Sequence, residues 1–384
     1  MRVNIIETFQ PRICSTPLTK AIYSPESLPA AESGDLPMAI SVRDVAREAG
    51  VSVGTVSNVL NRPAMVAPAT VERVTAVIQK LGFVRNEAAR QLREGRSRSF
   101  GLVVLDARNP FFMDVNHGAQ SRALENGYSV LMGTSDESSD HEHRLLDLFE
   151  EQRVAGILIS PVDADLTRLW RIREAGTPVV LVDRGSSDKS FSSVSVDDVE
   201  GGRLAVQHLL DLGRRRIVFV GGPENIVQVK ERFAGAQAAV SATPSASLEL
   251  RRTSSLSVLA GRQVGEEIAS SPEDERPDAI FAANDLLATG LLQALVMNGS
   301  VKVPQDIALI GYDDIDFMQS AVIPISSIKQ PAAEIGKTAV ELLLREAEAN
   351  PDSAREQILF TPELVAREST IGRLPIESAS DQSP

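Results

Sequence analysis

The chain has 384 residues, enough to bury more than one apolar core, so two or three domains are expected. It contains no apolar run near the ~20 residues that cross a bilayer, which excludes a membrane protein of the helical class. The single cysteine, Cys14, excludes an internal disulfide framework and fits a reducing cytoplasm. The net charge of −13, taken alone, argues against a nucleic-acid partner.

Both ends of the chain have the composition of disordered segments. Residues 1–38 are rich in Pro, Ser and Glu, lack apolar periodicity and contain no signal-peptide core, so secretion is not expected. Met38 lies just before the first predicted helix and is a second candidate start of translation. Residues 373–384 are predicted to be a disordered tail without a leucine heptad.

The stretch from Ser41 to Asn61 predicts two short helices joined by a tight turn, because apolar residues recur at helical spacing on either side of Gly50. Gly50 has the backbone freedom that such a turn needs, and Ser52 is a candidate N-cap for the second helix. Helices joined in this way cross steeply and leave the start of the second free to enter a DNA major groove. An ordinary helical hairpin has the same pattern.

The next residues shift the balance toward DNA. A third helix is predicted from Pro68, which suits a first helical turn, to Gly82, which suits a helix end. Residues 41–98 hold ten Arg and Lys against five Asp and Glu, a local charge of +5 inside an acidic chain. Because electrostatic interactions are screened beyond roughly 10 Å, this local basic segment matters more to a polyanion than the distant acidic bulk.

From about Met38 to Phe112 the chain resembles the DNA-binding end of the lactose-repressor (LacI/GalR) family of bacterial transcription regulators. The resemblance is carried by DVAREAGVS-x-x-TVS-x-VLN in residues 44–61, NEAARQL in residues 86–92 and GLVVLDARNPFF in residues 101–112. It implies a helix-turn-helix domain over residues 39–85, a hinge helix with its linker over 86–98, and a ligand-binding and dimerisation domain over 99–372.

The resemblance implies that the second helix, Val53–Leu60, lies in the major groove. A valine can contact a thymine methyl group, whereas Asn58 stands where many relatives carry arginine and can pair with adenine but not make the arginine–guanine fork. Thr55 and Ser57 suit hydrogen bonds to phosphates or bases, with plain surface polarity as the alternative. The DNA-contacting residues expected from this region are Ser52, Val53, Gly54, Thr55, Ser57, Asn58 and Asn61.

The hinge segment is the second expected DNA contact. So short a helix is marginal in water, and the resemblance implies that two hinge helices, one per subunit, fold together in the minor groove, with Leu92 as the wedge that unstacks a base step. Arg85 replaces the proline that relatives often carry there. A solvated basic linker is the alternative. The hinge residues expected to touch DNA are Asn86, Ala89, Arg90, Leu92 and Arg93.

From Phe100 onward, apolar runs and helical stretches alternate at roughly thirty-residue intervals, which predicts parallel sheets with right-handed crossovers. Two successive sets of runs predict two Rossmann-like lobes around a shared cleft. The predicted fold class is therefore an α-helical helix-turn-helix headpiece followed by an α/β, two-lobed, periplasmic-binding-protein-like sensor. The predicted strands are 101–105, 129–133, 156–160, 178–182, 216–222, 279–283 and 307–312, with weaker support for 248–252.

The two lobes are expected to be discontinuous in sequence, as in the family. We expect the first lobe to hold about residues 99–197 plus 329–350, and the second about 198–328 plus 357–372, with a strand pair after residue 356. About three connections would then join the lobes, an arrangement that suits hinge closure.

Polar residues follow the predicted strands, where ligands bind in α/β folds. By resemblance to the family's effector pocket, a small polyhydroxylated molecule is expected there. Carboxylates accept hydrogen bonds from its hydroxyl groups, and arginine donates two hydrogen bonds as a fork. The arginine is expected at the start of a helix. Helix capping is the alternative for each Asp and Asn, and the favoured one for Asp285. The effector-binding residues expected are Asn109, Phe111, Phe112, Ser135, Asp183, Arg232, Asn284 and Asp313.

No catalytic, cofactor or metal motif is recognised. HExxH and paired CxxC are absent, and Gly221-Gly222-Pro223 lacks the spaced glycines of a dinucleotide loop. His141 and His143 are interpreted as exposed loop histidines rather than metal ligands. The sequence therefore predicts a protein that is not an enzyme and that needs neither a cofactor nor a metal.

These observations combine into one prediction: a cytoplasmic, nucleoid-associated homodimer that binds a palindromic double-stranded DNA operator, with repression favoured, and that responds to a small-molecule effector in the cleft, with a sugar or related metabolite favoured. No membrane partner is expected. The alternatives are a free sugar-binding protein of the periplasmic type, a regulator controlled by a protein corepressor, and an enzyme built on the same layers. Export of the protein would indicate the first alternative. A DNA affinity that responds to a partner protein and not to a ligand would indicate the second, and turnover of a bound sugar would indicate the third.

Overall fold

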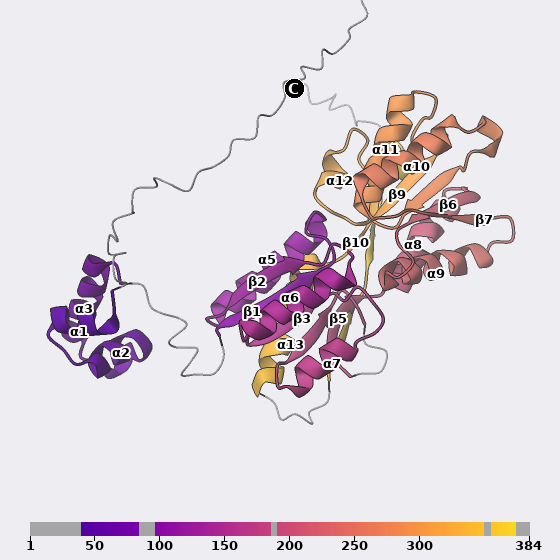
Figure 1. The fold of residues 1–384 in the computed structure, drawn as a ribbon. Helices are drawn as coiled ribbons and strands as arrows, with labels where there is room; N and C mark the ends of the chain where they lie inside the picture. Colours follow the sequence, from indigo (N-terminus) through magenta and orange to yellow (C-terminus); the bar gives the residue numbers. More distant parts are fainter. Residues whose placement is uncertain (1–39, 84–96, 186–189, 349–354, 374–384) are drawn as a thin grey trace, which may run out of the picture. The chain divides into compact units, whose positions relative to one another are not determined.

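The computed structural model describes residues 40–83, 97–185, 190–348 and 355–373. The chain divides at Asn86 into a headpiece and a body, which are described separately (Figure 1). Residues 86–96 of the predicted hinge lie outside the described residues, as do the predicted N-terminal extension and the tail beyond Arg373. Within the described segments, no helix combines the length and the apolarity needed to cross a membrane.

The headpiece is a small bundle of helices α1 (Val42–Ala49), α2 (Val53–Asn61), η1 (Pro63–Met65) and α3 (Pro68–Leu81). The predicted helix ends are confirmed. Gly50 and Gly82 end helices with positive φ angles of 63° and 64°, and the Ser52 hydroxyl caps α2 by accepting a hydrogen bond from Thr55 N at 3.0 Å. The apolar faces of all three α-helices meet in one core, whose fully buried members are Val45, Val56 and Val74.

The body contains two six-stranded sheets. The first has the order β11-β5-β4-β3-β1-β2 and is parallel throughout. The second has the order β12-β10-β9-β8-β6-β7 and is parallel except for the antiparallel edge strand β12. The first sheet comprises β1 (Ser99–Val104), β2 (Ser129–Thr134), β3 (Gly156–Ile159), β4 (Val179–Val182), β5 (Ser192–Val196) and β11 (Gln357–Phe360). The second comprises β6 (Arg216–Gly221), β7 (Ser247–Arg252), β8 (Ala279–Ala282), β9 (Ala308–Asp313), β10 (Ser326–Lys329) and β12 (Glu363–Val365).

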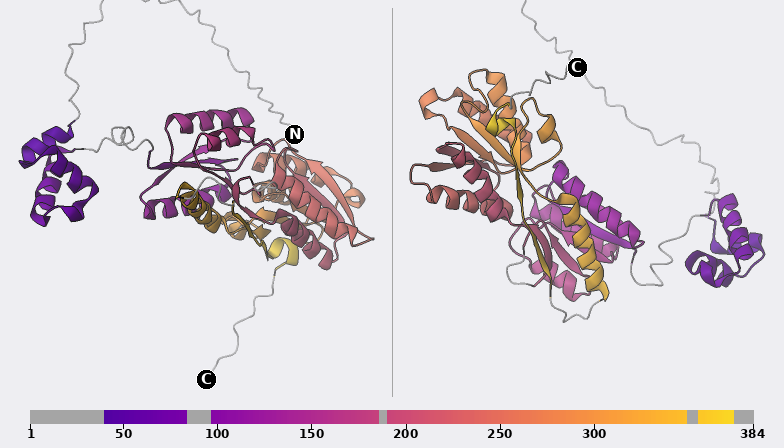
Figure 2. Two further views of the ribbon diagram at one scale, coloured as in Figure 1. Left: turned by 90° about the horizontal axis from the view of Figure 1, so that it is seen from below. Right: turned by 180° about the vertical axis from the view of Figure 1, so that it is seen from behind.

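Helices cover both faces of each sheet, which is why the central strands read as continuous apolar runs. In the first lobe, α5 (Pro110–Glu125) packs with α13 (Ala332–Glu348) on one face, while α6 (Ser139–Glu151) and α7 (Thr167–Glu174) lie on the other. Figure 2 shows α13, in gold, packed within the lobe that is built mainly from the purple and magenta part of the chain. In the second lobe, α8 (Asp198–Asp211) pairs with α9 (Val227–Ser241) and α10 (Val258–Ser270) pairs with α11 (Asp285–Asn298). The remaining short helices are η2 (Glu273–Glu275), α12 (Phe317–Ser320) and α14 (Glu368–Ile371).

The chain passes between the lobes three times, after β5, after β10 and between β11 and β12. The two strands predicted after residue 356 are present as β11 and β12, but they lie in different sheets, because β11 joins β5 in the first and β12 joins β10 in the second. The boundary of the second lobe therefore moves from residue 357 to a position beyond Phe360. Strands β5 and β10 escaped prediction because three and two of their residues are serines, whose buried hydroxyls interrupt the apolar pattern.

Candidate functional site

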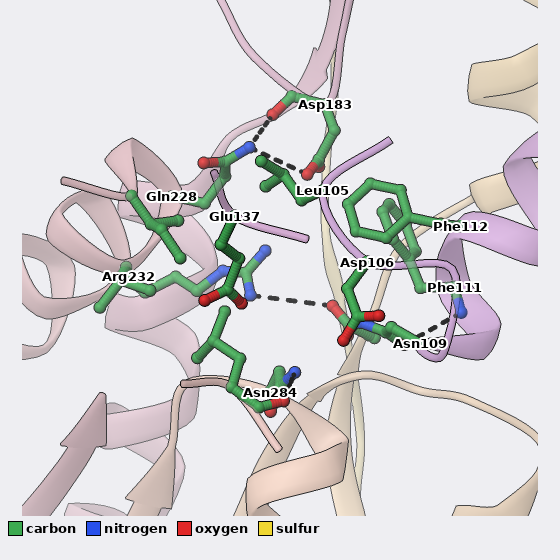
Figure 3. Close-up of a pocket in the computed structure, with 14 residues that line it drawn as sticks. Leu105, Asp106, Asn109, Phe111, Phe112, Glu137, Asp183, Gln228, Arg232 and Asn284 are labelled. Atoms are coloured by element: carbon green, nitrogen blue, oxygen red, sulfur yellow. Dashed lines mark hydrogen bonds and ion pairs between the residues drawn. The ribbon is translucent and has the colours of Figure 1, made fainter. Parts of the chain in front are cut away.

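A cavity lies between the lobes, where the strands of both sheets reach their carboxyl ends (Figure 3). Its first-lobe lining comes from the segments after β1, β2 and β4 and the start of α5, and its second-lobe lining from α9, the segments after β7 and β8, and the end of β9. The lining includes seven of the eight predicted effector residues, namely Asn109, Phe111, Phe112, Asp183, Arg232, Asn284 and Asp313.

Arg232 holds the second-lobe side of the cavity. It lies in the second turn of α9, so its predicted place at the start of a helix is wrong. Its Nε donates to Asp198 Oδ1 at 2.7 Å, its Nη1 donates to Ala283 O at 2.7 Å, and the guanidinium carbon lies 3.7 Å from the centre of the Tyr312 ring. Burial acts to lower the pKa of Arg232, but Asp198 and other neighbouring acids outweigh it, so the guanidinium stays charged.

Asp313 links the two lobes at the end of β9. Its carboxylate accepts a hydrogen bond from Asn109 Nδ2, in the first lobe, at 2.9 Å, and another from Gln330 Nε2 at 2.8 Å. Arg232 Nη1 lies 3.7 Å from the same carboxylate. Burial raises the pKa of Asp313 to about 6, although Arg232 and the two amide donors act in the opposite direction. The carboxylate is thus balanced between its protonated and ionised forms near pH 6 and is mostly ionised at neutral pH.

Asp183 is the matching first-lobe residue at the end of β4, where its φ angle is 57°. Gln228 Nε2, from α9 in the second lobe, donates to the main-chain oxygen of Asp183 at 2.6 Å and to its Oδ2 at 3.0 Å. Among the described residues, the buried Oδ1 has no hydrogen-bond partner. Burial, reinforced by Asp198, raises the pKa of Asp183 well above its ordinary value. A water molecule or a hydrogen-bond donor of a bound ligand would satisfy this oxygen.

The cavity is small while these cross-lobe contacts are made. Its free volume is about 30 Å³, the room of roughly one water molecule. A sugar is several times larger, so it enters this site only when the lobes separate or the lining side chains move.

Two predicted ligand residues also serve the fold. Asn284 caps α11, since its Oδ1 accepts from Leu287 N at 2.9 Å, and its Nδ2 donates to Leu256 O at 3.2 Å. Asn109 caps α5 by accepting from Phe111 N at 3.1 Å, which sets the rings of Phe111 and Phe112 edge to face at 5.0 Å. Their polar atoms are therefore held in place before any ligand arrives.

Two other predictions are corrected by the geometry. Asp285 is not the helix cap: it is the first residue of α11, fully buried, and its carboxylate accepts from Ser327 Oγ at 2.7 Å and Ile315 N at 2.9 Å. Ser135 is buried beside the cavity, but its hydroxyl donates to Val104 O at 3.2 Å and it does not contribute to the lining.

Sequence reasoning missed three polar lining residues, Asp106, Glu137 and Gln228. Asp106 comes almost directly after β1, and Gln228 precedes Arg232 by four residues, so it lies on the same face of α9. The position of a strand end and the helical spacing could therefore have predicted Asp106 and Gln228 as lining residues. Glu137 was not, because its placement depends on a φ angle of 59° in the turn after β2.

His141 and His143 lie within α6 and not in a loop, so the predicted loop is wrong there. The helix begins with Ser138 as its N-cap, and the acidic residues around the histidines occupy the first turn, where the helix dipole favours negative charge. Within the part of the chain that the structure describes, no group of three or more His, Cys, Asp or Glu is placed to hold a metal ion.

The headpiece presents the start of α2 to solvent. Val53 is 46% exposed, and Gly54, Asn58 and Asn61 are also exposed, while Thr55 and Ser57 are half-buried. The Ser52 and Thr55 hydroxyls share a hydrogen bond at 2.9 Å, and Asn61 Nδ2 donates to Ser57 O at 2.8 Å. The exposed arginines of the headpiece include Arg43, Arg62 and Arg73. The predicted hinge contacts Asn86, Ala89, Arg90, Leu92 and Arg93 lie outside the described residues.

Two family models match the chain. One describes bacterial regulatory proteins of the lacI family and matches residues 41–86, and the other describes a periplasmic binding protein-like domain and matches residues 206–370. The HTH-type transcriptional repressor PurR of Aliivibrio fischeri (strain MJ11) is 32% identical over 341 residues, covering 87% of this chain and 99% of that protein.

Solved structures agree with the sequence comparison. A Lac repressor dimer bound to operator and the anti-inducer ONPF has a TM-score of 0.73 and 28% identity, covering 86% of this chain and 99% of that one. A complex of the transcriptional regulator CelR with cellobiose has a TM-score of 0.63 and 30% identity, covering 86% and 99% of the two chains. The likeness therefore extends over the headpiece and both lobes.

Proposed function

Because this chain belongs to the lacI family of bacterial regulatory proteins, we propose that it is a DNA-binding transcription repressor controlled by a small molecule in the cleft between its lobes. The observation that carries the proposal is the joining of an exposed helix-turn-helix to a body whose interlobe cavity is lined by Asp183, Arg232 and Asp313. Its place of action is the cytoplasm, at the nucleoid.

The headpiece reads the operator through the major groove. Val53 offers an apolar contact for a thymine methyl group, and Asn58 offers the donor and acceptor pair that matches adenine. One such helix reads only a few bases, so the proposed unit is a homodimer on a palindromic operator. That a Lac repressor dimer of the same fold binds operator DNA supports this assembly.

The hinge residues supply the second DNA contact in the proposal. Leu92 is the wedge in the minor groove, and Arg90 and Arg93 neutralise phosphates beside it. These assignments rest on the NEAARQL segment of the sequence alone.

The effector is proposed to be an uncharged, hydroxyl-rich molecule such as a sugar. The cavity lining offers carboxylate acceptors on both lobes. Arg232 is the guanidinium of the lining, and it is already paired with Asp198. Hydroxyl groups donate to the carboxylates, while Phe111 and Phe112 supply an apolar face for the carbon skeleton. The cellobiose complex of a relative shows that this fold holds a sugar.

Coupling follows from the lobe contacts. A ligand that replaces the Asn109–Asp313 and Gln228–Asp183 hydrogen bonds changes the spacing of the lobes and therefore of the two hinge segments in the dimer. Such coupling between sites is typically ~1–3 kcal/mol. The direction, induction or corepression, is set by which lobe spacing favours the paired hinge helices.

The deciding experiment measures DNA and effector together. Fragments upstream of the chain's own gene and its neighbours are titrated by gel retardation, with and without sugars chosen from a thermal-shift screen. Retardation of a palindromic fragment that a sugar alters by about tenfold agrees with a coupling of this size. Equal affinity for a palindromic and a random duplex, with and without metabolites, would contradict the proposal. A response only to a partner protein would replace the sugar with a protein corepressor.

A further inference from the structure

Buried acids outnumber buried bases where the two lobes meet. Three carboxylates, each at most 5% exposed, lie close enough to Arg232 for their charges to act on its guanidinium. Asp183 comes from the first lobe, whereas Asp198 and Asp313 come from the second. A fourth carboxylate, Asp285, is fully buried in the second lobe and lies within reach of the charge of Asp313. Among the described residues, Arg232 alone makes ion pairs with this cluster, at 2.7 Å from Asp198 and 3.7 Å from Asp313.

Two neighbouring arginines are engaged elsewhere and do not correct the imbalance. Arg184 follows Asp183 in the sequence, but its guanidinium donates to Asp163 O. Arg367 is paired with Asp314, at 2.6 Å.

The first-lobe side of the cavity adds more acid. Asp106 and Glu137 both line it, and among the described residues only Asp106 has an ion-pair partner, Arg108, at 2.8 Å. If every carboxylate of the cluster were ionised, buried negative charge would exceed buried positive charge. Such an excess is strongly unfavourable away from water, so a narrow cleft favours protonation of part of the cluster.

Only two members of the cluster depend on the spacing of the lobes. Asp198 pairs with Arg232 of its own lobe, and Asp285 accepts hydrogen bonds from groups of its own lobe. Asp183 instead accepts from Gln228 of the opposite lobe, at 3.0 Å, and Asp313 accepts from Asn109 of the opposite lobe, at 2.9 Å. Separating the lobes breaks both contacts and hydrates both carboxyl groups.

The electrostatics of Asp183 and Asp313 agree with this geometry. Burial raises the pKa of Asp183 well above its ordinary value, and the charge of Asp198 raises it further, while Arg232 acts in the opposite direction. Burial also raises the pKa of Asp313 to about 6, against Arg232 and the amides of Asn109 and Gln330. Because hydration returns a carboxyl group toward its ordinary pKa, the narrow cleft binds protons more tightly than the open one. Protons therefore stabilise the narrow cleft, and this stabilisation is lost as pH rises through the raised pKa values.

We propose that the cleft is proton-sensitive: Asp183 and Asp313 take up protons from solution when the lobes approach and release them when the lobes separate, so that rising pH opens the unliganded sensor. An effector whose hydroxyl groups donate to the same two carboxylates favours their ionised forms and displaces the protons. The opening itself is independent of the proposed repressor function, and only its transmission to the operator rests on that function.

The test measures the separation of the lobes in the full-length protein without effector. Spin labels are attached at Arg171→Cys in α7 and Gln237→Cys in α9, two exposed positions on different lobes, after the single native cysteine is replaced by Cys14→Ser. Labelled chains are mixed with an excess of unlabelled chains, so that double electron–electron resonance reports distances within one chain. The ratio of wide to narrow clefts should rise about tenfold or more between about pH 5 and about pH 8, since opening lowers the pKa of Asp313 from about 6 toward 3.8.

Two neutral variants identify the groups that respond. Asp183→Asn and Asp313→Asn should each weaken the pH response, because the amide keeps an acceptor oxygen and does not ionise. Asparagine also tolerates positive φ angles, which are 57° and 111° at these positions. Asp274→Asn is the matched control, since Asp274 is an exposed acid of η2 outside the cavity lining, and its response should equal that of the wild type.

Three results overturn the proposal. One is the same distance distribution at both pH values in the wild type, with circular dichroism showing a folded chain at each. Another is a response that persists undiminished in both asparagine variants, which marks acids elsewhere as its source. The third is a cleft that widens at the lower pH. Operator affinity at the same pH values separates this proposal from the repressor function: a cleft that opens without changing operator affinity keeps the proton-sensitive cleft and contradicts the proposed coupling to DNA.

Discussion

The side-chain amide of Gln228, in α9 of the second lobe, donates at once to the main-chain oxygen of Asp183, at 2.6 Å, and to its carboxylate, at 3.0 Å, at the end of β4 in the first lobe. Asn109 and Asp313 form a second amide–carboxylate pair across the cleft, with donor and acceptor lobes exchanged. The groups that would recognise an effector thus hold each other when the cleft is narrow. Ligand binding is therefore an exchange of partners, and several predictions depend on it.

Replacing Asp313 by Asn should weaken effector binding by about 10–100-fold while operator binding persists, since a charged hydrogen bond is worth about 1.5–3 kcal/mol. Ser135→Ala is the control, because its hydroxyl bonds to Val104 O rather than facing the cavity. Calorimetry with the screened sugar and gel retardation with the operator measure the two effects. Unchanged sugar affinity in Asp313→Asn would place the effector elsewhere.

Asp313 should also give the body a characteristic pH dependence. Its native pKa of about 6 lies above the unfolded value near 3.8, so the native state binds the proton more tightly. The free energy of unfolding therefore falls as pH rises from about 4 to about 6, by roughly 1–3 kcal/mol. Denaturant titrations of the wild type and Asp313→Asn at pH 4.5 and 7.5 test this expectation, and a difference between them that is the same at both pH values speaks against it.

Leu92→Ala should weaken operator binding by about tenfold or more, because the wedge that opens the base step is lost. Affinity for the effector should stay unchanged, because the proposed role of Leu92 is to contact DNA. Gel retardation and calorimetry on the same preparation make the comparison. Full operator affinity in the variant removes the proposed role of the hinge.

Operator affinity should fall steeply with salt, with a log–log slope of about −0.9 per neutralised phosphate. Arg90→Ala should reduce the magnitude of that slope by about one, whereas Arg262→Ala, in α10 of the body, should leave it unchanged. Fluorescence anisotropy between about 50 and 300 mM salt, a range over which the Debye length falls to about half or less, provides the measurement. A flat curve for the wild type would contradict a phosphate-binding headpiece.

The helix pair α10–α11 should not tolerate a side chain at Gly290. A Cβ there would collide with the main chain of Val258 and Arg262, so Gly290→Ala should destabilise the body by about 1–3 kcal/mol or more. Gly54→Ala provides the opposite case. Gly54 is exposed on α2, and a Cβ there would meet only Ser52 Oγ, at 3.6 Å. It should stabilise the headpiece by up to about 1 kcal/mol. Thermal unfolding monitored by circular dichroism checks both signs.

Much of the fold was accessible from sequence because local patterns and tertiary structure agree. Gly50, Ser52, Pro68 and Gly82 mark the helix ends of the headpiece in both, and the apolar runs of β1, β3, β4, β6, β8 and β9 match buried strands. Strands β5 and β10 were missed because their serines are satisfied by partners distant in sequence, such as Ser327 with Asp285. Such long-range compensation leaves no local signal.

The candidate site was predicted in part for the same reason. Positions at strand ends, such as Asp183 and Asp313, follow from the architecture of α/β folds. Whether a polar side chain faces the cavity or the backbone depends on turn geometry, which separates Glu137 from Ser135 although both follow β2. The pairing of Arg232 with Asp198 needed two helices to be placed side by side, which one sequence does not reveal.

The C-terminal segment supplies β11 to one sheet and β12 to the other, with only two residues between them. A single cut near residue 355 would strip an edge strand from each lobe at once and expose the main-chain hydrogen-bonding groups of β5 and β10. Proteolysis or a premature stop at that point should therefore yield an aggregating product in place of a regulator with one damaged half.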